Sequence, residues 1–214
     1  MKKHIRNILA AVVILSLIML AGCGGGSSET EETSADQQSE AAELQTAEPI
    51  GIHHAEIVIK DYGTVSVELD GDTAPITVQN FLDLANAGFY DGLTFHRIID
   101  GFMIQGGDPN GDGTGGSGNN IVGEFEANGY ANSIAHTKGV ISMARAQDPD
   151  SASSQFFIMV EDAPHLDGQY AAFGHVTDGQ DIVDKIAADA VPLDDNGTMA
   201  AEDQPVIESV KIID

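Results

Sequence analysis

The clearest alternation of apolar and polar residues lies at 63–70, where Val65, Val67 and Leu69 are separated by polar residues. A period of two is typical of a strand with one buried face. The preceding run, 55–61, has the same character, and a short turn separates the two runs. The pattern therefore predicts a pair of strands at 55–61 and 63–70.

A helical period follows in two places. The first predicted helix has about 14 residues, begins near Pro75 after the start signals Asp72 and Thr73, and ends before Gly88. The second is predicted at 179–188. The apolar stripes that these helices are expected to bury are Val78, Phe81, Leu82 and Ala85 in the first, and Ile182, Val183, Ile186 and Ala187 in the second.

Short apolar runs bounded by turn residues make up most of the remaining chain. They predict further strands at 133–136, 139–144, 155–160, 171–176 and 206–213, whereas the polar, glycine-rich segment 109–120 is a loop. Many short strands, two isolated helices and no regular alternation of strand and helix favour an antiparallel barrel or sandwich capped by helices.

The segment 95–108, FHRIIDGFMIQGGD, combines two apolar runs with an Asp-Gly turn and one of only nine basic residues, Arg97. A two-residue loop would place Arg97 opposite Ile104, and a three-residue loop would place it opposite Gln105. We predict the second register. It brings Arg97, Gln105 and Met103 to one face, where a guanidinium, an amide and a thioether form a binding surface.

A second informative run is QFFIMV at 155–160. A period of two puts Gln155 and Phe157 on one face, and Phe156 and Ile158 on the other, which we assign to the core. A buried amide must be hydrogen-bonded, so we expect Gln155 to border a groove.

The N-terminal region has its own composition. Three basic residues, an apolar run of thirteen positions and then small residues have the order of a secretory signal, and the run is shorter than the roughly 20 residues of a membrane span. LAGC at 20–23 resembles the lipobox of bacterial lipoproteins. We expect a lipoprotein signal peptide at 1–22, lipidation of Cys23, a disordered acidic linker over 23–49 and a single domain at 50–214. The protein would be extracytoplasmic and lipid-anchored to a bacterial cell membrane.

The charge of the chain limits its partners. Nine basic and 34 acidic residues give a formal net charge of −25. Nucleic-acid binding depends on basic residues that neutralise phosphates, so we exclude that class. An anionic membrane surface would also repel the domain, and we expect membrane contact through the lipid anchor only.

Five segments, in this order, are similar to motifs of the cyclophilins, the peptidyl-prolyl cis/trans isomerases. They are FHRIIDGFMIQGGD (95–108), GTGG (113–116), SMARA (142–146), SQFFI (154–158) and LDGQYAAFG (166–174). The resemblance spans nearly the whole domain. It implies a closed eight-stranded antiparallel β-barrel capped by two α-helices, and an isomerase that acts on X-Pro bonds as a monomer without a cofactor.

The resemblance also implies roles for individual residues. Arg97 would be the catalytic arginine. Phe102, Met103, Phe157 and Leu166 would line the proline pocket, and Gln105, Ala144, Arg145, Ala146 and Gln155 would contact the peptide backbone. Tyr170 stands where relatives carry His or Tyr. His165 stands where many members have Trp, so we expect weak cyclosporin binding.

Such an isomerase needs no nucleophile, metal or proton carrier, because it makes and breaks no covalent bond. Because the chain also has a predicted export signal, we expect the isomerase to assist the folding of exported proteins, whose X-Pro bonds isomerise slowly. The alternative is a proline-peptide binding module or chaperone without turnover.

The sequence supports a calcium or zinc site less well than it supports an isomerase. Asp108, Asn110, Asp112 and Gly113 match the opening of an EF-hand loop, but Asn119 stands where glutamate is required. The histidines lack zinc-ligand spacing. We expect His96, which faces away from the arginine, to be a hydrogen-bonded core residue.

Overall fold

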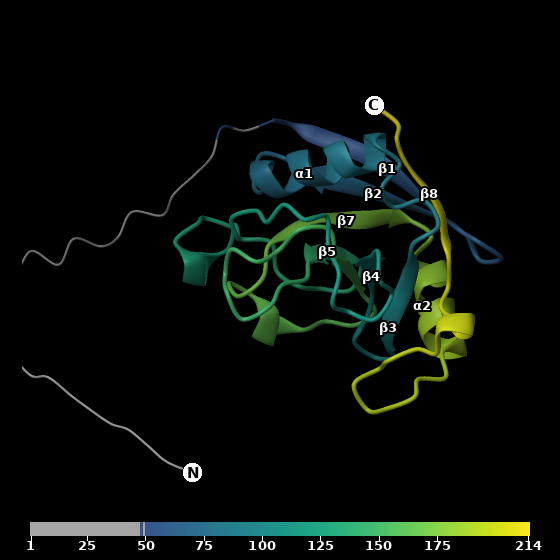
Figure 1. The fold of residues 1–214 in the computed structure, drawn as a ribbon. Helices are drawn as coiled ribbons and strands as arrows, with labels where there is room; N and C mark the ends of the chain where they lie inside the picture. Colours follow the sequence, from purple (N-terminus) through teal and green to yellow (C-terminus); the bar gives the residue numbers. More distant parts are fainter. Residues whose placement is uncertain (1–47, 49) are drawn as a thin grey trace, which may run out of the picture. The chain divides into compact units, whose positions relative to one another are not determined.

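The computed structural model describes residues 48 and 50–214 (Figure 1). The signal peptide, Cys23 and nearly all of the linker lie outside the described residues. The strands are β1 (Ile52–Ile59), β2 (Gly63–Asp70), β3 (Thr94–Ile99), β4 (Met103–Asp108), β5 (Val140–Met143), β6 (Phe156–Met159), β7 (Ala172–Asp178) and β8 (Ile207–Ile212). The helices are α1 (Pro75–Asn86) and α2 (Gln180–Asp189), and the short 3-10 helices are η1 (Glu126–Asn128), η2 (Pro164–Leu166) and η3 (Ala201–Asp203). In this part of the chain, no helix combines the length and apolar character needed to cross a membrane.

The eight strands form one antiparallel sheet in the order β3-β4-β6-β5-β7-β2-β1-β8. The predicted closure of the barrel needs correction. Between the described edge strands β3 and β8 there is no ladder but an isolated bridge, Thr94 to Val206. A few backbone hydrogen bonds flank it: the Phe95 amide donates to the Pro205 carbonyl, 2.9 Å, and Ile207 bonds to Gly92 and Leu93, both 2.8 Å. Pro205 has no N–H to extend that pairing into a ladder. The fold is an open half-barrel.

Both helices pack against the main apolar core. Residues of the two predicted stripes are buried there, including Phe81 of α1 and Ile186 of α2, while Ile182 is half-buried at its edge. Figure 1 shows α1 beside β1 and β2, and α2 at another end of the sheet, near β3. The sheet therefore encloses one continuous apolar core between the helices.

Strand β6 separates that core from a second one. Phe156 and Ile158 belong to the main cluster, whereas Phe157 and Met159 pack with Met103 in the other. The predicted assignment of the two faces is confirmed, because alternate side chains of a strand point in opposite directions.

The start of α1 is held by a residue that is remote in sequence. Glu124, only 1% exposed, accepts hydrogen bonds from the backbone amides of Ile76, 3.1 Å, and Thr77, 2.7 Å. The start signals upstream are used otherwise: Asp72 accepts from the Gly51 amide. The helix begins at Pro75 as predicted, but its free N–H groups are satisfied from another loop.

The predicted strand at 133–136 is wrong. Its backbone bonds to side chains instead of a neighbouring strand: the Ile134 amide donates to Asn132 Oδ1, 3.1 Å, and the His136 amide to Asp167 Oδ1, 2.7 Å. Side chains therefore replace the ladder, and the segment has no regular secondary structure and is not part of the sheet.

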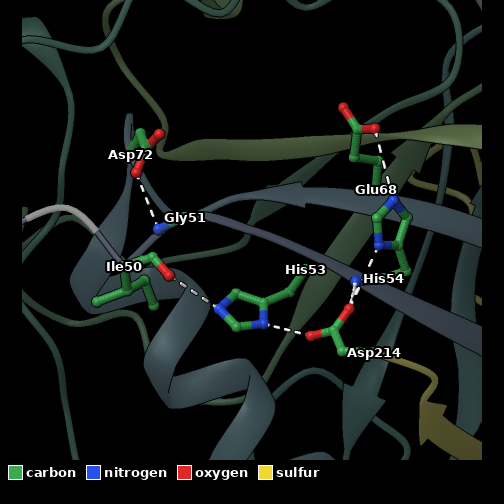
Figure 2. Close-up of polar contacts among 7 residues, drawn as sticks. All are labelled: Ile50, Gly51, His53, His54, Glu68, Asp72 and Asp214. Carbon is green, nitrogen blue, oxygen red and sulfur yellow. Dashed lines mark hydrogen bonds and ion pairs between the residues drawn. The ribbon is translucent and has the colours of Figure 1, made fainter.

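Asp214 fastens the end of the described chain to β1 (Figure 2). Its carboxylate contacts the ring of His53, and it accepts from the backbone amide of His54, 2.8 Å. The ring nitrogen Nε2 of His54 lies 3.7 Å from the carboxylate of Glu68 on β2. These contacts tie β1 to the last residue after β8, next to where the predicted linker enters the domain.

Candidate active site

The hairpin β3–β4 has the predicted three-residue loop and places Arg97 opposite Gln105. Gly101 supplies the positive φ, 74°, that the turn requires. On the next strand, Phe157 of β6 pairs with Gln105. The register prediction is confirmed, and it aligns an arginine, an amide and an aromatic ring across three adjacent strands.

The guanidinium of Arg97 is fixed at two nitrogens. Its Nε donates to the backbone carbonyl of Asn196, 2.8 Å, and its Nη1 donates to Gln105 Oε1, 3.2 Å, and lies 3.8 Å from Met103 Sδ. Nη2 makes no hydrogen bond to any described residue. The arginine thus keeps a donor free while its plane is held.

Partial burial lowers the pKa of Arg97 from its ordinary value, and the negative charges that Tyr170 and Asp194 can carry act in the opposite direction. An arginine pKa is so high that the side chain stays charged in proteins. A permanent cation therefore lies in a partly desolvated position, where its electrostatic effect is stronger than in water.

The amides of Gln105 and Gln155 form a relay. Gln105 Nε2 donates to Gln155 Oε1, 2.9 Å, and Gln155 Nε2 donates to the carbonyls of Gly113, 3.1 Å, and Gly115, 2.8 Å. Both amide orientations are thereby fixed. Gln155 is hydrogen-bonded at a groove, as its position in an apolar strand predicted.

A hollow of about 220 Å³ lies beside the arginine. Its lining combines polar groups, including those of Arg97 and Gln105, with the buried side chains of Met103, Phe157 and Leu166. It is lined by Arg97, Phe102, Met103, Gln105, Ala144, Arg145, Phe157, Leu166 and Tyr170. The structure therefore brings together nine of the twelve predicted site residues of the domain around one small pocket.

A more polar hollow of about 390 Å³ adjoins the first and shares Gln105, Ala144 and Arg145 with it. Gln155 and Ala146 line only this second hollow. The two hollows form one groove, with a mixed apolar and polar part at Arg97 and a more polar part along the glycine-rich loop.

His165 is the one predicted site residue that lines neither hollow. It is exposed, and its ring stacks on Phe102 with centroids 5.8 Å apart. It contributes to the rim by supporting a pocket residue.

Arg145 lines both hollows. Its guanidinium lies over the rings of Phe125, 5.1 Å, and Tyr170, 4.7 Å, and its Nη2 donates to the Gln169 carbonyl, 2.9 Å. Sequence reasoning missed Phe125 and Gln169. Phe125 lies outside every motif segment, and Gln169 lies within the motif at 166–174 but contributes only its backbone carbonyl, so only the fold shows their contact with Arg145.

The floor of the pocket is supported by a buried histidine. His136 stacks on Phe157, with centroids 6.0 Å apart, and its ring nitrogens lie 3.0 Å from Ser142 Oγ and 3.1 Å from Asp167 Oδ1. Burial lowers the pKa of His136, and Asp167 opposes this. The hydrogen bond from the His136 backbone amide is the main factor that lowers the pKa of Asp167. No local signal marked this support, because its members are distant in sequence.

His96 is buried as predicted, at 4% exposure, but the expected hydrogen bonds are wrong. Neither ring nitrogen has a partner among the described residues. Burial lowers the pKa of His96, which favours the neutral ring.

The EF-hand-like segment is organised by its own backbone. The carboxylate of Asp108 accepts from the amides of Asn110, 2.8 Å, and Asp112, 3.2 Å. Across residues 50–214, no group of three or more His, Cys, Asp or Glu side chains is arranged to hold a metal ion. Ordinary turn chemistry accounts for this loop.

Comparison with known proteins identifies the class. Residues 54–214 match the family described as cyclophilin type peptidyl-prolyl cis-trans isomerase/CLD. The chain is 50% identical over 122 residues to peptidyl-prolyl cis-trans isomerase B of Bacillus subtilis, covering 57% of this chain and 82% of that protein. It is 47% identical over 126 residues to the peptidyl-prolyl cis-trans isomerase of Helicobacter pylori, covering 58% and 74%.

Solved structures agree. A crystal structure of a cyclophilin-type isomerase from Cryptosporidium parvum superposes with a TM-score of 0.67 at 30% identity, covering 76% of this chain and 98% of the other. A second structure of that protein, in the presence of the dipeptide Ala-Pro, gives a TM-score of 0.66 at 31% identity, covering 75% and 99%. The chain belongs to the cyclophilin family and is a peptidyl-prolyl cis-trans isomerase.

Proposed function

We propose that Arg97 is the catalytic residue of this isomerase. Rotation about a peptide bond is opposed by amide resonance, with a barrier of about 18 to 20 kcal/mol, and X-Pro bonds take tens to hundreds of seconds to isomerise unaided. In the twisted transition state the prolyl nitrogen loses conjugation and becomes a hydrogen-bond acceptor. A fixed cation that donates there stabilises the transition state more than the planar amide.

The observation that carries this proposal is the free Nη2 of Arg97. The other two nitrogens of the guanidinium are engaged by Asn196 and Gln105, so the remaining donor is held in one orientation. It belongs to a residue that lines the smaller hollow, within reach of a ring bound there. A preorganised donor costs no rearrangement when the amide twists.

The substrates that fit this groove are flexible polypeptides with X-Pro bonds. The smaller hollow would hold the proline ring against its apolar side chains Phe102, Met103, Phe157 and Leu166. Gln105, Gln155 and the strand end at Ala144, Arg145 and Ala146 would contact the peptide backbone. The Ala-Pro dipeptide used with the Cryptosporidium relative is of this class.

Arg97→Ala tests the role of the arginine. We expect kcat/KM for an X-Pro peptide to fall on the order of 100-fold, as for loss of one transition-state donor. Lys211→Ala, which removes a cation from the exposed face of β8, should keep the wild-type value. A protease-coupled assay measures both, and equal rates for Arg97→Ala and the wild type would refute the proposal.

We further propose that the protein assists the folding of exported proteins while anchored by lipid at Cys23. The motivation is the signal and lipobox pattern at 1–23, together with the acidic composition that follows. Prolyl isomerisation limits the folding of many chains, so an extracytoplasmic isomerase has a substrate in newly exported proteins. The domain would act as a monomer, without nucleic acid, and with weak affinity for cyclosporin because His165 stands at the rim.

A further inference from the structure

The segment between α2 and η3 runs along the open edge of β3, where Figure 1 shows it as the yellow loop. The Ile98 amide donates to the Gly197 carbonyl, 2.8 Å, and the Met199 amide donates to the His96 carbonyl, 2.9 Å. Thr198 forms an isolated bridge with Arg97. The loop therefore takes the place of a neighbouring strand beside the arginine.

Asp194 shapes this loop. Its Oδ1 accepts from the backbone amides of Asn196, 3.0 Å, and Thr198, 3.1 Å, and its Oδ2 accepts from the Thr198 hydroxyl, 3.0 Å. These bonds, chiefly those from Thr198, lower the pKa of Asp194. The next residue, Asp195, makes no side-chain hydrogen bond to any described residue.

Gly197 lets the loop approach β3 closely. Its φ is 86°, and a Cβ at this position would lie 2.5 Å from the Ile98 carbonyl oxygen. A side chain here would force the loop away from the strand. The hydrogen bonds to Asp194 thus fix the conformation of the loop, and Gly197 allows the loop to pack directly against β3.

The consequence for the active site is the position of one carbonyl. Asn196, inside the turn that Asp194 closes, presents its oxygen to Arg97 Nε, 2.8 Å. With Gln105 on Nη1, this contact fixes the guanidinium plane at two points and aims Nη2. Without it, the arginine could rotate about its last torsions, and misplacement of a catalytic group by about 1 Å can cost on the order of 100-fold in rate.

We propose that Asp194 is a positioning residue for catalysis: it folds the 194–198 turn so that the Asn196 carbonyl holds Arg97 Nε. This inference rests on the proposed catalytic role of Arg97. Asp194 is exposed and acts through hydrogen bonds to the loop, not by touching substrate.

The first test compares three variants in an isomerase assay. Asp194→Ala should lower kcat about 10-fold with KM within about twofold, because the transition-state donor is misplaced while the pocket is intact. Asp194→Asn should stay within about threefold of the wild type, since its amide oxygen can accept the same backbone bonds. Asp195→Ala, the matched control, should be unchanged. Wild-type activity in Asp194→Ala, or equal losses in the Asn and Ala variants, would overturn the proposal.

The second test separates positioning from general damage. In an Arg97→Ala background, Asp194→Ala should cause no further loss, because the residue acts through the arginine. A further loss of similar size would contradict this. If Arg97→Ala itself is fully active, the proposed function fails and this inference with it; if only Asp194→Ala is fully active, the inference fails alone.

A measurement on the unaltered protein avoids any dependence on how the variants fold. The Nε–H proton of Arg97 should exchange slowly with solvent in NMR spectra, because it is bonded to the Asn196 carbonyl. Exchange as fast as that of a solvated arginine would overturn the positioning contact.

Discussion

At the residue scale, the proposed role of Arg97 explains how an isomerase can work without a nucleophile or a proton carrier. The bond that rotates is never broken, so the protein needs a donor at the twisted amide and a grip on the ring. In the proposed mechanism, Met103 and Phe157 would hold the ring in the pocket and Arg97 would supply the donor. Its rigidity comes from Gln105 and Asn196, neither of which needs to touch the rotating bond.

Arg145 gives a second residue-scale prediction. Because its guanidinium lies between Phe125 and Tyr170 and bonds to the Gln169 carbonyl, Arg145→Ala should loosen the rim of the groove. We expect KM to rise about fivefold to tenfold with kcat changed less than twofold, as for loss of uniform binding.

Arg145→Lys is the comparison for that prediction. An ammonium keeps the charge but lacks the planar fork that stacks and bonds together, so it should not restore KM. A fall in kcat with an unchanged KM in the alanine variant would contradict a rim role. Steady-state kinetics on one X-Pro peptide checks both variants.

The site residues whose side chains lie on strands could be predicted from the sequence, and the loop residues that support them could not. Arg97 and Gln105 are eight positions apart on one hairpin, so strand geometry alone relates them. Asn196 and Gln169 contribute only backbone carbonyls, and a carbonyl leaves no mark in the sequence. Their positions depend on how distant loops pack.

At the element scale, β5 and the turn after η2 are joined through His136. The ring bridges Ser142 of β5 and Asp167, and it supports Phe157 on β6. A single buried side chain therefore connects three segments under the pocket. This bridge requires a neutral or well-compensated ring, because burial disfavours the charged form.

The stability of the fold should depend on pH through this histidine and His96. Burial lowers the pKa of both in the folded state, so the unfolded chain binds protons first, near its ordinary pKa of about 6.5. The free energy of unfolding should be constant above about pH 7.5 and decrease as the pH falls through 6.5. It should level off below the folded-state pKa values.

Urea unfolding between pH 8 and pH 5 measures this dependence. His136→Gln should reduce the slope, whereas His175→Gln, at an exposed position of β7, should leave it unchanged. Stability that increases from pH 7 to pH 5, with the same slope in the His136 variant, would contradict a buried neutral ring.

Elements with strong periodicity were predictable, and their boundary contacts were not. The alternation at Gly63–Asp70 and the stripe of α1 reflect burial directly. The segment 133–136 has similar residues, but Asn132 and Asp167 take its backbone hydrogen bonds. The cap from Glu124 is equally invisible, because it lies 47 positions after Thr77.

At the scale of the whole molecule, the half-barrel leaves β3 as an edge strand, and the 194–198 turn occupies that edge. Closure by a complete ladder was predicted from family resemblance. Whether the barrel closes depends on the backbone pairing between the ends of β3 and β8. Pro205 limits that pairing because it has no backbone N–H to donate. The open edge is what allows a loop carbonyl to reach Arg97.

The proposed anchor gives a whole-molecule prediction. When it is expressed in a bacterium, the wild-type protein should be found in the membrane fraction with a lipid-modified Cys23 as its N-terminus, because two or more acyl chains give stable attachment. Cys23→Ser should lose the modification, whereas Ser28→Ala should keep it. Fractionation with mass spectrometry checks this, and a wild-type protein in the cytosol with residues 1–22 retained would contradict the anchor.

The most direct test of catalysis by Arg97 is NMR exchange spectroscopy on one X-Pro peptide, which measures the isomerisation rate on the enzyme and the dissociation constant in the same samples. For Arg97→Ala at saturating peptide, we predict a rate lower by on the order of 100-fold and a dissociation constant within about threefold of the wild type. A rate that stays at the wild-type value while the peptide is bound would contradict the account.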